Sequence, residues 1–283
     1  MAAAQPLATR LGRNLLAWTA RPVKATTDPR SLSPHRRLRF RCNLCGAHDA
    51  ALLSALSREI ASCAKCGSTV RFRAIAHIVV RELLRSDLAL SDAPMRRDLR
   101  GLGLTDAHPY ATPLAEHFDY QNTFYHTEPK LDIMDVPRER FGQYDFIIAS
   151  DVFEHVAPPV SRAFANARRL LKPGGIFVFT VPFSLDPMTV EHFPELHEWR
   201  LEQSNGRFTL YNRTRDGRDQ VFDQLVFHGG DGSTLEMRLF SRAGLEREFA
   251  DAGFSRIRIA DEPYLPFGIY WPEPWSVPIV AYT

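Results

Sequence analysis

The sequence lacks any long uninterrupted apolar run. No stretch approaches the roughly 20 residues needed to span a bilayer, and residues 1–41 have no continuous apolar segment of the secretory type. We therefore expect a cytoplasmic protein without a membrane span. An excess of one charge is also absent, because 35 Lys and Arg face 33 Asp and Glu, a formal net charge of +2. Net charge by itself gives no indication of nucleic acid binding.

Acidic residues are missing from the start of the chain, since none precedes Asp28. Residues 1–40 are rich in Arg, interspersed with Ala, Ser, Thr and Pro. This composition favours a basic flexible arm. Two alternatives remain open: an organelle transit segment, which is also Arg-rich and acid-poor, and a surface that contacts RNA or anionic lipid.

Cysteine is scarce, with four residues in the whole chain, but the four are arranged as two pairs. Each pair encloses two residues, and seventeen residues separate the pairs. This is the spacing of a zinc ribbon, which we place at residues 41–69, with a closed tetrahedral structural site. Two disulfides are the alternative, but an intracellular chain of this length needs no such bridges. The predicted zinc ligands are Cys42, Cys45, Cys63 and Cys66.

A helix from about Val70 to Ser86 follows the second cysteine pair, as apolar residues recur there at helical spacing. Residues 70–94 would then connect the ribbon to a larger domain. Arg71 and Arg73 lie just beyond the second pair. They form either a solvated basic edge, which we favour, or contacts to an anionic substrate. We expect His77 to be packed and not to act as a ligand.

The stretch from Tyr144 to Phe183 reads as strand, helix, turn and strand. Short apolar runs at Phe146–Ala149 and Ile176–Val181 are typical of parallel strands buried on both faces. A crossover of this kind is right-handed, and ligands bind beyond the carboxyl ends of the strands. Polar and aromatic residues at those ends therefore belong near a site. They are Asp151, Glu154, His155, Pro182 and Phe183.

The motifs Ser-Asp-Val-Phe-Glu-His-Val and Leu-Lys-Pro-Gly-Gly in this stretch resemble the central part of class I S-adenosylmethionine-dependent methyltransferases. The resemblance covers residues 95–283. It implies an α/β fold with a Rossmann-like seven-stranded sheet, mostly parallel with the last strand antiparallel, and S-adenosyl-L-methionine as cofactor. Four-cysteine modules also precede some bacterial methyltransferases, including certain ribosomal RNA methyltransferases. We thus expect a small N-terminal zinc ribbon, the methyltransferase domain and a β-rich insertion.

The loop after the first predicted strand, residues 98–104, departs from the family pattern, in which three glycines let the backbone approach the cofactor. Only two glycines occur, displaced into the strand, which leaves open a non-catalytic relative. Backbone amides at a helix start hold a carboxylate without glycine, and Asp106 is placed to accept from the cofactor's ammonium group. The predicted cofactor residues of this loop are Gly103, Thr105 and Asp106.

The remaining cofactor residues follow from the resemblance. Glu128, beyond a second strand predicted at residues 122–126, would accept from the ribose hydroxyls, and Asp132 would accept from the adenine amino group. Solvated loop carboxylates are the alternative for both. Ile133 or Met134 would cover the adenine ring. Ser150 and Asp151 would lie beside the sulfonium, unless they simply cap the next helix.

His155 would lie beneath the cofactor or pack against the sheet. Near the chain end, Ser241 is predicted to cap a helix over Arg242–Asp251. Residues 254–260 and 277–282 would form an antiparallel pair. Pro278 requires a bulge or a shifted strand boundary there, because it has no amide hydrogen.

Residues 186–241 exceed the minimal fold and should form a lid that recognises substrate. A hairpin is predicted from Arg207–Asn212 and Gln220–Phe227 through an Asp-Gly turn. A hydroxyl acceptor needs a base, and a histidine is the usual one. The candidates are His192, which we prefer, His197 and His228, with Glu191 or Glu198 orienting one of them. Methyl transfer requires no metal, and these scattered residues do not predict a catalytic zinc.

The sequence therefore predicts a methyltransferase that methylates an oxygen of a sugar or another small polar metabolite. A small-molecule or glycan acceptor is favoured over RNA. The alternatives are an RNA methyltransferase, which the ribbon and the basic arm suggest, and a non-catalytic binding or scaffold protein, which the glycine-poor loop suggests.

Overall fold

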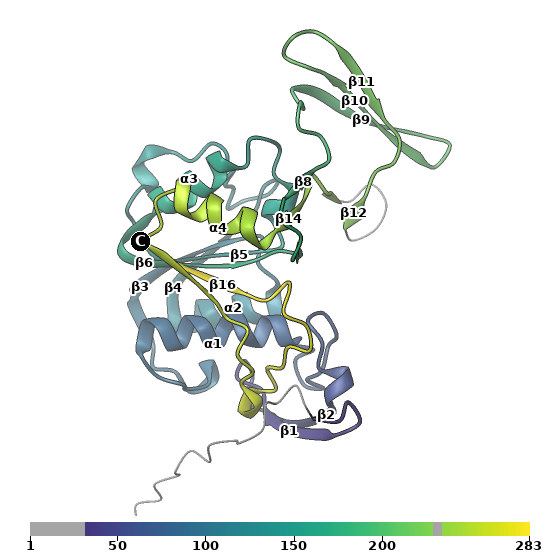
Figure 1. The fold of residues 1–283 in the computed structure, drawn as a ribbon. Helices are drawn as coiled ribbons and strands as arrows, with labels where there is room; N and C mark the ends of the chain where they lie inside the picture. Colours follow the sequence, from purple (N-terminus) through teal and green to yellow (C-terminus); the bar gives the residue numbers. More distant parts are fainter. Residues whose placement is uncertain (1–31, 229–233) are drawn as a thin grey trace, which may run out of the picture.

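A six-stranded sheet forms the centre of the computed structural model, which describes residues 32–228 and 234–283 (Figure 1). The predicted flexible arm lies mostly outside these residues. Two helices cover each face of the sheet (Figure 1). On one face lie α1 (Val70–Leu84) and α2 (His108–His117), and on the other α3 (Ser161–Leu170) and α4 (Arg242–Asp251). Among the described residues, none of the helices has the length and apolarity that crossing a membrane requires.

The sheet has the mixed topology that the resemblance implied. In spatial order its strands are β15 (Arg256–Ile259), β16 (Ile279–Tyr282), β6 (Leu171–Thr180), β5 (Tyr144–Ser150), β3 (Arg96–Leu104) and β4 (Phe118–Thr123). The four strands from β6 to β4 pair in parallel, whereas β16 is antiparallel to both of its neighbours. The carboxyl ends of β3, β4, β5 and β6 therefore meet at one edge.

Several predicted boundaries agree closely with the structure. The helix α4 spans the predicted residues, and the Ser241 hydroxyl accepts from the Gly244 amide at 2.9 Å. Pro278 lies just before β16, so the boundary is shifted and the strand needs no bulge. The strand β4 ends at Thr123, whereas the prediction extended to residue 126.

The described sheet has six strands, one fewer than the seven predicted. The segment between β4 and β5 makes only an isolated bridge, Phe124 with Lys130, and a 3-10 helix, η4 (Arg138–Arg140). The edge beside β4 is thus not extended by a further strand in the part that the structure describes.

The four-cysteine module is a hairpin followed by a loop. Its strands β1 (Arg37–Arg41) and β2 (His48–Leu52) pair antiparallel, and the 3-10 helix η2 (Leu53–Ala55) follows directly. The 3-10 helix η3 (Leu90–Asp92), beyond α1, contacts the module through the Ser91 amide, which donates to the Asn43 carbonyl at 3.1 Å. The hairpin begins at Arg37, earlier than the predicted residue 41. The Phe40 ring packs against Gly268, which directly follows η6 (Leu265–Phe267). The contact is close, because a Cβ added at Gly268 would lie 2.7 Å from the Phe40 ring. The module is therefore packed onto the C-terminal segment.

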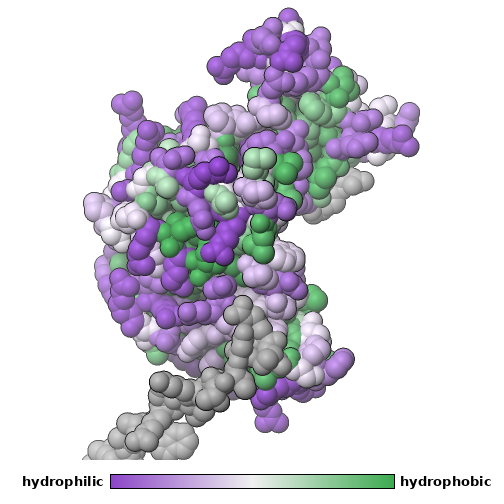
Figure 2. Space-filling view, viewed as in Figure 1, coloured by the Kyte–Doolittle hydropathy of each residue, from purple (hydrophilic) through white to green (hydrophobic). Residues whose placement is uncertain are grey.

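The insertion has two parts. Its short strands β7 (Phe183–Ser184) and β8 (Val190–Glu191) flank β14 (Arg238–Ser241) beside the main sheet. The predicted hairpin is confirmed within a three-stranded arm, made of β9 (Glu198–Ser204), β10 (Arg207–Arg213) and β11 (Asp219–Phe222). Strands β12 (Phe227–His228) and β13 (Thr234–Leu235) form a small ladder. The arm projects from the body, and a recess separates it from the four-cysteine module (Figure 2).

The glycines of β3 make room for rings that lie across the sheet. A Cβ at Gly101 would overlap the Phe146 ring, and one at Gly103 would overlap the Tyr120 hydroxyl and come within 2.6 Å of an Asp106 oxygen. Since Tyr120 and Phe146 stack at 5.9 Å, neither ring has space to retreat. These glycines therefore serve side-chain packing within the sheet.

Gly103→Ala is expected to lower the free energy of unfolding by about 1–3 kcal/mol, the usual cost of overpacking a core. Urea denaturation measures this cost. Adding Tyr120→Phe removes the closest overlapping atom, so the double variant should lose less than the sum of the two single variants. Strictly additive losses would show that the Tyr120 hydroxyl does not restrict this position.

Candidate functional site

The loop after β3 encloses a buried carboxyl group, that of Asp106. The Tyr110 hydroxyl donates to one of its oxygens at 2.7 Å, and the Tyr120 hydroxyl donates to the other. The side-chain amide of Asn122 holds the loop by accepting from the Asp106 amide at 2.9 Å and donating to the Asp106 carbonyl at 2.8 Å. Burial raises the pKa of Asp106 to about 7, against the opposing effect of the two tyrosine hydroxyls. Both oxygens of Asp106 already have protein partners.

Two residues at the strand ends adopt the left-handed conformation without being glycine. Thr105, directly after β3, has a φ of 58°, and Asp151, directly after β5, has a φ of 56°. A β-branched residue such as threonine rarely adopts this conformation, and such strain concentrates at ligand sites. The Thr105 amide donates to the Thr123 carbonyl at 2.7 Å, so the neighbouring strand end holds the strained turn in place.

Asp151 is held by two arginines from outside the sheet. Arg58, in the loop after η2, contacts the Asp151 carboxylate at 2.5 and 3.0 Å, and Arg71, in the first turn of α1, lies 3.2 Å from it. Arg71 also donates to the Ser150 hydroxyl, and Glu59 pairs with both arginines. Burial would raise the pKa of Asp151, but the two guanidinium groups outweigh it and lower the pKa. The four-cysteine module thus contributes charge directly to the carboxyl end of β5.

This arrangement corrects the expectation of a solvated basic edge at Arg71 and Arg73. The Arg71 side chain is only 12% exposed, and that of Arg73 is fully buried. Arg73 donates to the Ser68 carbonyl at 2.9 Å and to the Gly268 carbonyl at 3.0 Å. His77 is packed, as expected, with its ring 4.2 Å from that of Tyr264. Both arginines are therefore structural parts of the junction between module and sheet.

The predicted ribose and adenine residues lie in the segment after β4. Glu128 is exposed, and its carboxylate accepts from the Lys130 amide at 2.9 Å. Asp132 is half-buried and accepts from the Met134 amide at 2.8 Å, while Ile133 is buried. Because β4 ends at Thr123, Glu128 lies farther beyond the strand end than the sequence suggested.

The four cysteine sulfurs come together at one point. The Sγ atoms of Cys42 and Cys66 are 3.6 Å apart, those of Cys45 and Cys63 are 3.7 Å apart, and all four lie within 4.8 Å of one another. No disulfide forms at these separations. Gly46 and Gly67 adopt φ values of 72° and 67° directly after the two pairs, as tight turns of this kind require.

A second polar cluster lies at the carboxyl end of β5, where the insertion covers it. His192 Nε2 and His228 Nε2 lie 2.9 and 2.7 Å from the two oxygens of Glu236. His228 also contacts His155, with ring centroids 4.7 Å apart, and Glu154 lies beside both. Burial raises the pKa of Glu154 well above its usual range and lowers the pKa of His155. The sequence indicated His155, His192 and His228 separately but missed Glu236 as their common partner.

Arg238 connects the chain segments that carry this cluster. Its side chain is fully buried, pairs with Glu191 at 2.6 Å, and donates to the carbonyls of Phe153 and Val156 at 2.8 and 2.6 Å. Glu191 therefore orients Arg238, whereas Glu236 contacts the histidines.

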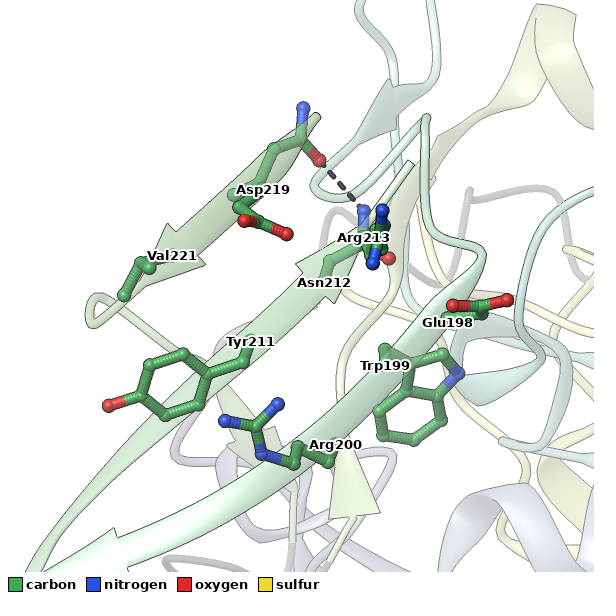
Figure 3. A pocket seen from close by; sticks show the side chains of 9 residues that line it. Glu198, Trp199, Arg200, Tyr211, Asn212, Arg213, Asp219 and Val221 are labelled. Atoms are coloured by element: carbon green, nitrogen blue, oxygen red, sulfur yellow. Dashed lines mark hydrogen bonds between the residues drawn. The ribbon is translucent and has the colours of Figure 1, made fainter. Parts of the chain in front are cut away.

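His197 lies apart from this cluster. It is exposed at the base of the arm, next to Glu198, and its amide donates to the Asn212 side chain at 2.8 Å. The surface of the arm carries a hollow of about 670 Å³ between β9, β10 and β11, where Arg200 stacks on Tyr211 and Trp199 lies nearby (Figure 3). None of the residues lining this hollow comes from a strand end of the main sheet. We therefore locate the candidate active site at the strand ends.

A methyltransferase domain family matches residues 106–258, which is more than half of the chain. The chain belongs to this methyltransferase family. This membership agrees with the resemblance found in the sequence.

Two curated relatives are similar to parts of this methyltransferase. A hybrid PKS-NRPS synthetase of Petromyces alliaceus is 31% identical over 153 residues, which is 50% of this chain and 4% of that protein. The polyketide synthase component of the lovastatin nonaketide synthase of Aspergillus terreus is 33% identical over 115 residues, 38% of this chain and 4% of that protein. The chain thus spans only a small fraction of the length of either relative.

Solved structures of methyltransferases are similar at low identity. The 1,6-didemethyltoxoflavin-N1-methyltransferase of Burkholderia thailandensis is 13% identical, with a TM-score of 0.41 and coverage of 74% of this chain and 76% of that one. The sugar N-methyltransferase KedS8 of Streptoalloteichus is 16% identical, with a TM-score of 0.43 and coverage of 76% and 88%.

Asp106 generates a prediction about pH. Its folded pKa of about 7 lies above the unfolded value of about 4, so the folded protein keeps a proton that the unfolded chain releases. This group therefore makes the folded protein less stable as pH rises from about 4 to about 7. The free energy of unfolding of Asp106→Asn, minus that of wild type, should therefore increase as pH rises from about 4 to about 7. Urea denaturation without cofactor measures this difference.

The matched control is Asp135→Asn, because Asp135 has an 88% exposed side chain. Its stability should follow the wild-type pH dependence. If the free energy of unfolding of Asp106→Asn also showed the wild-type pH dependence, the pKa of the Asp106 carboxyl group would not be raised.

Proposed function

We propose that this methyltransferase transfers the methyl group of S-adenosylmethionine to a hydroxyl oxygen of a sugar or another small polar metabolite. The observation that carries the proposal is the histidine and carboxylate cluster at the end of β5, where Glu236 bridges His192 and His228 within the insertion. An acceptor rich in hydroxyl groups matches such donors and acceptors, whereas an apolar acceptor would leave them unpaired.

The cofactor would bind across the carboxyl ends of β3, β4 and β5, the edge at which open α/β sheets bind ligands. It supplies an electrophilic methyl group. Asp132 would accept from the adenine amino group, Ile133 would cover the ring and Glu128 would bind the ribose. Half-buried Asp132, close to buried Ile133, suits this task. Thr105 and Asp151, with their strained backbones, would border the methionine end.

Gly103 and Asp106 would act indirectly, because their contacts are with Tyr120 and Tyr110 in the floor of the loop. Ser150 pairs with Arg71 and would support the same floor. His155 would face the acceptor side, since its Nδ1 is 2.9 Å from the Leu235 carbonyl of the insertion.

In-line displacement at the methyl group requires alignment of the acceptor and exclusion of water. A hydroxyl acceptor must also lose its proton as the C–O bond forms and the C–S bond breaks. His192 is the proposed base, because Glu236 lies at 2.9 Å and would stabilise the imidazolium. His228, on the other oxygen of Glu236, would position the pair. His197 is the weakest of the three candidates, because it is exposed on the arm.

We also propose a structural zinc ion at the four cysteines. Tetrahedral zinc with sulfur bonds of about 2.3 Å places neighbouring sulfurs about 3.8 Å apart, close to the observed 3.6 and 3.7 Å. Four thiolates on one zinc carry a net negative charge, and the fully buried guanidinium of Arg73 lies among them, since its charge interacts with Cys42, Cys63 and Cys66. The ion would stabilise the module without taking part in the reaction.

Calorimetric titration with S-adenosylhomocysteine tests the cofactor site. Wild type should bind one molecule per chain, and Asp132→Ala should weaken binding at least about tenfold, the equivalent of about 1.4 kcal/mol. The control Asp135→Ala, three residues along on the exposed surface, should bind like wild type. Equal affinities for wild type and Asp132→Ala would reject the adenine assignment, and no binding by a folded wild type would reject the proposed function.

A further inference from the structure

Glu154 is a buried carboxylate to which no group in the described residues donates a hydrogen bond. It lies in η5 (Phe153–His155), directly beyond β5, and is 1% exposed. Within the described residues, neither of its side-chain oxygens has a hydrogen-bond partner. Burying a carboxylate in this way costs several kcal/mol unless a proton or a cation accompanies it. A proton or a bound cation would offset this cost, and the two histidines beside the carboxylate favour the cation.

Two histidine rings face this carboxylate. His155 Nε2 lies 3.8 Å and His228 Nδ1 lies 4.0 Å from Glu154 Oε1. One ligand atom from each of the three residues falls within 4.8 Å of the others. Carboxylate and imidazole ligands on one metal are separated by about 3–4 Å when the bonds are about 2.0–2.2 Å long. The two carboxylate–imidazole separations therefore lie at the upper end of the range for ligands of one ion.

The far nitrogen of each histidine contacts an acceptor. His155 Nδ1 lies 2.9 Å from the Leu235 carbonyl, which only accepts, so Nδ1 carries the proton and Nε2 presents a lone pair to Glu154. His228 Nε2 lies 2.7 Å from Glu236 Oε2, within ion-pair distance of that carboxylate. Metal-binding histidines characteristically donate their other ring N–H to a carbonyl or a carboxylate. The outer contacts of a metal site are thus already formed.

We propose that Glu154, His155 and His228 bind a divalent transition-metal ion, distinct from the zinc at the four cysteines. Two imidazoles and one carboxylate suit zinc, iron, cobalt or manganese, whereas magnesium and calcium prefer oxygen ligands alone. Glu236 is the outer carboxylate, and it connects the site to His192 at 2.9 Å. The main-chain bond from the Met237 amide to the Glu154 carbonyl, at 2.8 Å, ties the insertion to this position.

The site also has a role that rests on the proposed function. Three protein ligands leave coordination positions for the acceptor, and a hydroxyl bound to such an ion loses its proton more readily. The proton would pass to His192, the acceptor oxygen would bond to the methyl carbon, and S-adenosylhomocysteine would leave with the electron pair of the broken C–S bond. The metal site itself requires no turnover to be detected.

Metal content per chain tests the proposal. The full chain, dialysed against Co²⁺ after mild chelation, should bind two ions, one with sulfur-to-cobalt charge-transfer absorption and one without it. His228→Ala and the nearly isosteric Glu154→Gln should each bind one ion and keep the charge-transfer band. Cys42→Ser should lose that band and retain the second ion. The control His197→Ala, at an exposed histidine outside the cluster, should bind two.

One ion per chain in wild type, or two ions in both folded His228→Ala and Glu154→Gln, would overturn the metal site. Circular dichroism establishes that the variants are folded. The proposed function is tested separately by the S-adenosylhomocysteine titration, which contains no acceptor. Absence of binding by folded wild type would reject that function. Two ions with no cofactor binding would therefore leave the metal site standing and reject the methyl-transfer role.

Discussion

The ion pairs between Asp151 and two arginines join the four-cysteine module to the sheet at the point where chemistry is expected. Asp151 ends β5 in a left-handed conformation, and Arg58 and Arg71 reach it from the module and from α1. Glu59 balances the second positive charge. Since each of these charges is partly removed from water, loss of one partner would leave another uncompensated. The module therefore contacts the carboxyl end of β5, where the candidate active site lies.

Two fully buried arginines also connect distant segments of the chain. Arg73 links the module to the C-terminal segment through the Gly268 carbonyl, and Arg238 links the insertion to the turn after β5 through the Phe153 and Val156 carbonyls. A buried guanidinium presents several donors in a fixed plane, which suits the crossing of several backbone segments. Both added modules thus converge on the carboxyl end of β5, where the polar cluster lies.

The sequence predicted those features whose signals are local. The unit from β5 to β6, the helix α4 with its Ser241 cap and the cysteine turns each depend on neighbouring residues, and the structure agrees with them. The Asp-Gly hairpin likewise lies within the arm. The expectation of seven strands was wrong for the described residues, where the sheet has six strands and the segment after Thr123 forms only a bridge.

The remaining features depend on contacts between distant residues. Arg58 and Asp151 lie 93 positions apart, and His155 and Leu235 lie 80 apart, so spacing along the chain carries no sign of either contact. Gly103 was predicted to be a cofactor glycine displaced into the strand. In the structure the Tyr120 hydroxyl, which comes from the next strand, occupies the space that a Cβ at Gly103 would need. Asp106 was predicted to bind the ammonium group, whereas two tyrosines occupy its oxygens. In each case the partner, and not the residue itself, determined the role.

The most direct test of this account is the affinity of the Arg58→Ala, Arg71→Ala double variant for S-adenosylhomocysteine, measured by calorimetry. This ligand has no sulfonium charge, so a change in affinity does not report attraction between the sulfonium and a freed Asp151 carboxylate. The account predicts binding at least about tenfold weaker than wild type, with Arg85→Ala, 80% exposed at the end of α1, unchanged. Wild-type affinity in a folded double variant would show that the module does not shape the cofactor site.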